Sequence, residues 1–326
     1  MATNINRLEQ RLSGAYIELD DLIGARFSAK DLKLQQRRRA LSLLAGPNKT
    51  NFRGRGIDFE EVRAYQPGDD IRTIDWRVTA RTGKAYTKLF QEERERPLLV
   101  VTDQRQPMFF GSQHCFKSML ACYLSALIIW SGLQNSDRVG GLVFGNQRQQ
   151  EIRPRRSRKS ALALMHLMLE FNRELNRDSD LNTDLDSSLT QRLEETLIDL
   201  RRIARPGSAL YIVSDFAGFN QGDTLKHLHQ LSRHCEITSL FVYDPLEREL
   251  PPPGQYTVTD GNQRSLIHTG GSQTRQRYNQ HFDNKLQQLH QQLSKLGIPL
   301  IEVGTDQAPL QRLLYYFGAS KSGARR

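Results

Sequence analysis

Short apolar runs separated by helix-like segments recur from residue 97 to residue 317, and this alternation most restricts what the chain can fold into. Residues 98–101 and 209–213 are continuously apolar, as expected for strands buried on both faces. Helix-like segments between such runs lie at residues 112–133, 157–170, 189–203 and 274–296. Strand and helix in alternation predict an α/β fold with a doubly wound, mostly parallel sheet and helices on both faces.

Two aspartates, Asp103 and Asp215, directly follow two of these predicted strands. In open α/β sheets, ligands collect at the carboxyl ends of strands, near the point where the strand order reverses. The two carboxylates could serve a divalent-metal-dependent hydrolase, or each could simply favour a helix N-terminus. No ordered Ser-His-Asp or Cys-His set accompanies them in the sequence. The sequence therefore favours a non-enzymatic protein.

The segment from residue 54 to residue 97 is dense in charge but patterned like folded protein. Apolar and charged residues alternate at residues 57–62 and again at 74–78, which predicts two strands, and residues 86–90 predict a third. Acidic and basic side chains interleave, which indicates either a network of arginine–carboxylate pairs or an ordinary solvated face. The candidate partner-binding residues of this segment are Asp69, Asp70, Arg72, Asp75, Trp76, Arg77 and Arg81.

The same segment carries motifs similar to those of a known family. The runs YQPGDD, IDW, ARTG and EERERP occur in this order before the first buried strand. Together they resemble the signature of the bacterial domain-of-unknown-function-58 family, whose biochemical activity is poorly defined. Its members resemble von Willebrand factor A domains and typically accompany MoxR-type AAA+ ATPases. The resemblance therefore implies a von Willebrand factor A-like domain, with a MoxR-type AAA+ ATPase and other von Willebrand factor A-like proteins as partners.

The resemblance also implies a place for a metal ion. Von Willebrand factor A domains hold a divalent ion through an Asp-x-Ser-x-Ser motif, a threonine from a second loop and an aspartate from a third. Asp103, Thr183 and Asp215 match three of these positions, whereas Arg105 and Pro107 replace the two serines. Oxygen ligands suit Mg²⁺ or Mn²⁺, but this substitution removes two oxygens and adds a permanent cation. We expect no cofactor, or at most Mg²⁺ or Mn²⁺ at a degenerate site, with Arg105 as the alternative occupant.

The charge balance favours an anionic partner. The chain has 46 lysines and arginines against 36 acidic residues, a formal net charge of +10. This excess suits nucleic acid, a membrane surface or an acidic protein. A basic cluster after a predicted edge strand at residues 147–152 could bind phosphate, although no aromatic residue interleaves with it to stack on bases. Nucleic-acid binding is therefore the alternative function, through Arg153, Arg155, Arg156, Arg158 and Lys159.

The pattern divides the chain into four parts. These are an N-terminal helical segment (residues 1–50), a charged β-rich subdomain (51–96), the α/β domain (97–320) and a basic tail (321–326). The longest apolar segment, residues 116–133, contains Lys117 and three serines, which predicts a buried helix and not a transmembrane segment. The odd number of cysteines and the lack of an apolar leader at the start are typical of a cytoplasmic protein without a disulfide framework.

Overall fold

The computed structural model describes residues 12–34, 62–66, 74–88, 96–176, 185–219, 223–259 and 264–317. The chain divides into two units. The larger contains Met1–Asn48 and Arg96–Arg326, and the smaller contains Lys49–Glu95. The N-terminal residues therefore belong to the larger unit, where Trp130 Nε1 donates a hydrogen bond to the carbonyl of Leu22 at 2.8 Å.

Within the described residues, six strands form the central sheet of the larger unit, in the order β10-β7-β6-β3-β4-β5. All neighbours are parallel except β5, which pairs antiparallel with β4 at the edge. Strands β4 and β5 lie on one side of β3 and the later strands β6, β7 and β10 on the other, so the strand order reverses between β3 and β6. This confirms the predicted α/β fold with a mostly parallel sheet. The strands are β3 (Pro97–Gln104), β4 (Arg138–Gly145), β5 (Gln149–Arg155), β6 (Ala209–Ser214), β7 (Glu236–Tyr243) and β10 (Leu300–Gly304).

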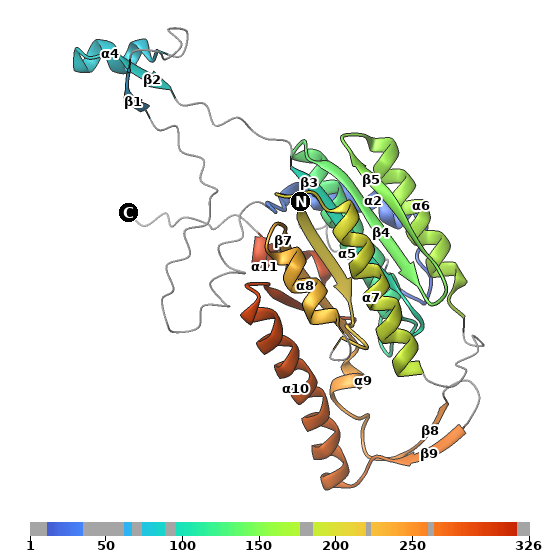
Figure 1. Ribbon diagram of the computed structural model, residues 1–326. Coiled ribbons are helices and arrows are strands. Elements are labelled where there is room, and N and C mark those ends of the chain that lie inside the picture. The colour runs from blue at the N-terminus through green and yellow to red at the C-terminus, as the bar shows by residue number, and fades with distance from the viewer. Residues whose placement is uncertain are drawn as a thin grey trace. The chain divides into compact units, whose positions relative to one another are not determined.

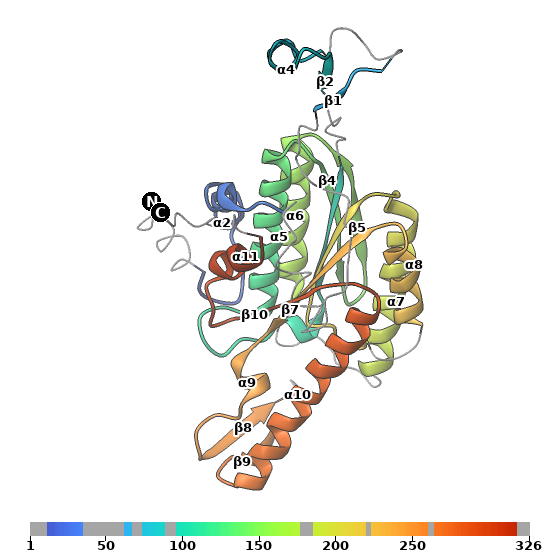
Figure 2. The same ribbon diagram turned by 90° about the vertical axis from the view of Figure 1, so that its left-hand side faces the viewer.

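Helices cover both faces of this sheet (Figures 1 and 2). Along β3, Val100 packs into the core on one face, whereas Leu99 and Val101 pack into the core on the other. The first face is covered by α2 (Leu19–Ser28), α5 (Lys117–Gln134), α6 (Arg158–Glu174) and α11 (Pro309–Phe317). The second face is covered by α7 (Leu185–Ile203), α8 (Thr224–Ser232) and α10 (Ser272–Lys295).

Short elements complete the larger unit. Strand β8 (Gln255–Thr259) pairs antiparallel with β9 (Arg264–His268). The 3₁₀ turns η1 (Ala29–Asp31) and η3 (Gln106–Met108) follow α2 and β3, and α9 (Pro245–Arg248) follows β7. Ser157 caps the N-terminus of α6, because its Oγ accepts a hydrogen bond from the backbone N–H of Lys159 at 3.1 Å. Within the described residues, no helix is both long and apolar enough for a membrane crossing.

The smaller unit contains one helix and a pair of strands within the described residues. Strand β1 (Val62–Ala64) pairs antiparallel with β2 (Tyr86–Lys88), which confirms part of the strand predicted at residues 86–90. The strand predicted at residues 74–78 is wrong, because helix α4 (Trp76–Thr82) occupies this position. Asp75 Oδ1 caps that helix by accepting from the N–H groups of Arg77 and Val78, at 3.0 and 3.2 Å. Gly83, with φ of 72°, ends it.

Candidate functional site

Asp103 and Asp215 lie at neighbouring strand ends, at the switch point of the sheet. Asp103 is the penultimate residue of β3 and pairs with Phe144 of β4, and Asp215 directly follows β6. Both side chains are buried, with exposed fractions of 0% for Asp103 and 3% for Asp215. Since a buried carboxylate requires a cation or several hydrogen-bond donors, the neighbours of these two residues define the site.

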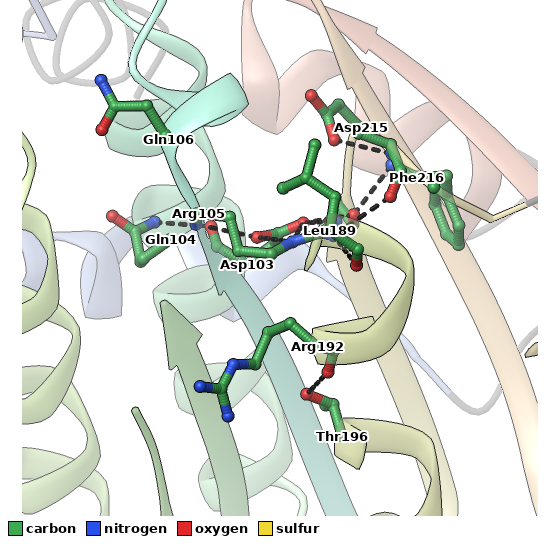
Figure 3. A network of polar contacts seen from close by, with 12 residues as sticks. Asp103, Gln104, Arg105, Gln106, Leu189, Arg192, Thr196, Asp215 and Phe216 are labelled. Atoms are coloured by element: carbon green, nitrogen blue, oxygen red, sulfur yellow. Dashed lines mark hydrogen bonds and ion pairs between the residues drawn. The ribbon is translucent and has the colours of Figure 1, made fainter. Parts of the chain in front are cut away.

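The guanidinium of Arg105 lies directly against the carboxylate of Asp103 (Figure 3). Its Nη2 is 2.7 Å from Asp103 Oδ2 and its Nε is 3.0 Å from Oδ1, so the ion pair is bidentate. The remaining nitrogen, Nη1, donates to the carbonyl oxygens of Leu189 at 2.8 Å and Ala217 at 3.1 Å. One buried side chain therefore connects the end of β3 to α7 and to the loop that follows β6.

Both residues of the Asp103–Arg105 pair make further contacts. Ser214 Oγ donates to Asp103 Oδ2 at 2.6 Å, and the ring of Phe144 lies 5.2 Å from the Arg105 guanidinium carbon. Burial lowers the pKa of Arg105, but the charge and hydrogen bonds of Asp103, with a contribution from Asp215, outweigh it and raise that pKa. Arg105 is therefore a permanent internal cation at the switch point.

A second buried cation, Lys117, holds the other aspartate. Its Nζ is 2.9 Å from Asp215 Oδ2 and 2.7 Å from Glu247 Oε1, and its side chain is 1% exposed. Burial raises the pKa of Asp215, but Lys117 above all, then Lys285 and Arg105, lower it below its usual range. The same two carboxylates raise the pKa of Lys117 against the effect of burial. Lys117 and Asp215 are thus both charged at neutral pH.

Asp244, at the end of β7, is a third buried carboxylate near this edge. Its oxygens accept hydrogen bonds from Ser112 Oγ and Thr305 Oγ1, each at 2.6 Å, and from two backbone N–H groups. These donors lower its pKa against the effect of burial, Ser112 contributing most. Asp244 also begins α9, the helix that carries Glu247. The hydrogen bonds thus join the ends of β7 and β10 to the loop before α5.

Sequence reasoning missed four members of this network: Lys117, Ser214, Asp244 and Glu247. Lys117 offered a signal, because a single lysine in an apolar helix is buried only when it is paired. Its partners Asp215 and Glu247 lie 98 and 130 residues further along the chain, so the pairing required the fold.

The described residues of this site do not fit a divalent ion. Asp103 and Asp215 supply carboxylates, but each already contacts a buried cation of the protein itself. Pro107, in η3, has no side-chain ligand to offer. Thr183 lies outside the described residues. A metal bound between these strand ends would have to approach the Arg105 guanidinium, which carries a fixed positive charge.

In the smaller unit, the structure describes some of the predicted partner-binding residues. Trp76 begins α4 and its side chain is 67% exposed, while Arg77 and Arg81 are exposed on the same helix. Asp75 caps this helix, whereas the sequence suggested that it belongs to a sheet face. Asp69, Asp70 and Arg72 lie outside the described residues, so the predicted arginine–carboxylate network stays a prediction.

The predicted basic cluster lies on β5 and at the start of α6, and all of its side chains are exposed. Arg153 and Arg155 are on the edge strand, Arg156 donates to Ser136 Oγ at 3.0 Å, and Arg158 and Lys159 begin the helix. The cluster is therefore spread over β5, the turn that follows it and the start of α6.

Comparison with known proteins matches most of the chain to one family. The family model described as protein of unknown function DUF58 covers residues 61–288. The uncharacterized protein Rv1480 of Mycobacterium tuberculosis is 26% identical over 231 residues, 71% of this chain and 69% of that protein. The uncharacterized protein YeaD of Bacillus subtilis is 30% identical over 87 residues, 27% of this chain and 20% of that protein.

One solved structure similar to this chain is that of an aerotolerance-related membrane protein from Bacteroides fragilis. The match has a TM-score of 0.37 and 14% identity, and it covers 68% of this chain and 98% of the other. That similarity is too low to define a shared fold.

Proposed function

This chain belongs to the DUF58 family, and from that premise we propose that it is a non-enzymatic interaction module for a MoxR-type AAA+ ATPase. In this proposal the larger unit is a von Willebrand factor A-like scaffold. The six-stranded, mostly parallel sheet with helices on both faces supports that assignment. The resemblance of the sequence motifs to the family, described above, supports the choice of partner.

The switch point supports a structural role for its carboxylates. A general acid or base must reach its substrate and exchange a proton near neutral pH. Asp103 is instead held by Arg105, and Asp215 by Lys117, with all four side chains buried. Because the pKa of Asp215 lies below its usual range, this carboxylate is a poor proton carrier at neutral pH. The arrangement favours a rigid edge that presents loops to a partner.

The observation that carries the proposal is the exposed Trp76 on a well-defined helix. Its side chain is 67% exposed, although tryptophan is usually largely buried. The helix is fixed at both ends, by Asp75 and by Gly83, so the indole is presented from a defined position. Arg77 and Arg81 are exposed on the same helix. Tryptophan and arginine are the residues that most often dominate the binding energy of protein interfaces.

The test is direct binding of the full chain to the purified MoxR-type AAA+ ATPase of the same organism, measured by interferometry with a non-hydrolysable ATP analogue. We expect a complex that Trp76→Ala weakens at least about tenfold, the scale of a hot-spot residue. Phe27→Ala is the matched control, because Phe27 is another exposed aromatic residue on a helix, 54% exposed, in the larger unit. Absence of a complex with or without nucleotide, or equal affinities of both variants, would contradict the proposal.

A further inference from the structure

A cleft of about 410 Å³ opens between the edge strand β5 and the C-terminal end of α7. It lies within the larger unit, away from the buried ion pairs of the switch point. Besides prolines and an isoleucine, its lining consists of charged side chains: Arg138, Glu151, Arg153, Arg155, Arg202 and Arg205. Five guanidinium groups thus share one concave surface with a single carboxylate, that of Glu151, which lies 3.7 Å from Arg153 Nε, and the remaining excess of positive charge concentrates anions.

The helix dipole explains only part of this charge. Helix α7 ends at Ile203, and cations near a helix C-terminus are favoured, which accounts for Arg202. Arg202 also pairs with Asp199 at 3.2 Å. Arg138 and Arg155 are on strands, where no comparable dipole acts. The helix dipole therefore does not account for the exposed guanidinium of Arg155 in this lining.

Strand β5 contains a β-bulge where it borders the cleft. Val139 pairs with Arg155 and Gly141 with Ile152, so Arg153 and Pro154 together stand opposite Gly140 in a β-bulge. Glu151, Arg153 and Arg155 line the cleft at alternate positions, as on one face of a strand, and at the bulge Pro154 joins them. Bulges frequently redirect side chains beside functional sites. The bulge is therefore a second observation, independent of charge, that distinguishes this surface.

We propose that this cleft binds a small anion that carries two or more phosphoryl groups. The planar guanidinium matches phosphate oxygens in a bidentate manner, and five of them exceed what one phosphate can engage. The volume lies within the range of small-molecule sites. Among the described residues that line the cleft there is no aromatic ring, so the phosphoryl groups are recognised and a nucleobase is not.

The test is calorimetric titration of the full chain with sodium tripolyphosphate, pyrophosphate and orthophosphate. We expect saturable binding at one site, tightest for tripolyphosphate and weaker as salt is raised. Arg155→Gln and Arg205→Gln should each weaken tripolyphosphate binding at least about fivefold, because each removes an exposed guanidinium from the lining. The melting temperature of each variant should stay near that of the unchanged chain.

Arg158→Gln is the matched control. It removes the same charge three residues from Arg155, but Arg158 begins α6 and does not line the cleft. An equal loss in this control would show a general charge effect and overturn the proposal, as would the absence of heat with tripolyphosphate. An oligothymidylate that displaces tripolyphosphate at equal phosphate concentration would also overturn it, in favour of a nucleic-acid backbone. None of these outcomes depends on the AAA+ partner.

Discussion

Arg105 Nη2 lies 2.7 Å from Asp103 Oδ2, and neither side chain is more than 1% exposed. The two residues are separated by one position in the chain, so the end of β3 supplies both the charge and its counter-charge. This self-contained pair occupies the edge of the sheet at which α/β proteins commonly bind ligands. The consequence is a rigid switch point whose charges are satisfied within the protein.

Breaking this pair on one side should destabilise the fold strongly. We expect Arg105→Met or Asp103→Asn to lower the free energy of unfolding by about 3–5 kcal/mol each, because each leaves an uncompensated buried group. The double variant should lose less than the sum, by at least about 1 kcal/mol, since neither charge then remains. Urea unfolding of the four proteins measures the coupling, and strictly additive losses would contradict it.

Replacing Lys117 should change how stability depends on pH. The folded-state pKa of Asp215 is lowered, so its contribution is present above the ordinary carboxyl pKa of about 4 and is lost as pH falls below it. In Lys117→Met, burial raises that pKa with less opposition. The variant should therefore be less stable at neutral pH but lose less stability on acidification. Urea unfolding between neutral and acidic pH is the measurement.

Lys226→Met is the control for that experiment. Lys226 pairs with Asp223 at 3.1 Å, but both side chains are exposed, at 63% and 61%. Solvent screens such a pair, so its loss should leave the acid profile unchanged. Parallel profiles for Lys117→Met and the unchanged chain would show that the buried lysine does not set the pKa of Asp215.

Removing the cap of α4 should loosen the helix that presents Trp76. Asp75→Ala deletes the acceptor of two backbone N–H groups, a change that typically costs about 0.5–2 kcal/mol. The amides of Arg77 and Val78 should exchange faster with deuterium, and affinity for the AAA+ partner should fall. Asp75→Asn keeps a capping oxygen and should preserve both. Equal behaviour of the alanine and asparagine variants would contradict the role of the cap.

Filling the space at Gly140 should disturb the bulge. A methyl group there would collide with the backbone of Ile152 and Pro154. Gly140→Ala should therefore lower stability by about 1–3 kcal/mol and weaken tripolyphosphate binding. Gly270→Ala is the control, because the nearest atom to its added Cβ is 3.9 Å away. Unchanged tripolyphosphate affinity in a folded Gly140→Ala protein would show that the bulge does not contribute to binding in the cleft.

The α/β architecture could be predicted because its signals are local. The apolar runs at β3 and β6 and the cap at Ser157 depend on neighbouring residues alone. The strand prediction at residues 74–78, around Trp76, was wrong for a related reason. Ile74, Trp76 and Val78 alternate as in a strand, but Asp75 and Gly83 are also the cap residues of a short helix. Two local patterns competed, and a helix of seven residues is too short for periodicity to separate them.

The candidate site was less predictable because its contacts are long-range. Asp103 and Asp215 could be assigned to strand ends, and Arg105 could be considered as an internal cation. The carbonyl oxygens of Leu189 and Ala217, which fix the guanidinium, carry no side-chain signal in the sequence. The cleft could not be predicted from the sequence for the same reason. Arg155 belongs to a basic run in the sequence, but Arg205, which also lines the cleft, follows a helix that is distant in the sequence.

Pro154 has a further consequence at the open side of the sheet. Strand β5 is an outermost strand, and an unpaired strand edge is a template on which another chain can add a strand and begin to aggregate. Proline offers no N–H for such pairing, and the bulge interrupts the regular spacing of the remaining groups. The exposed Arg153 and Arg155 would also repel the same strand of a second copy. The residues that line the cleft thereby hinder the addition of a further strand at the β5 edge of the sheet.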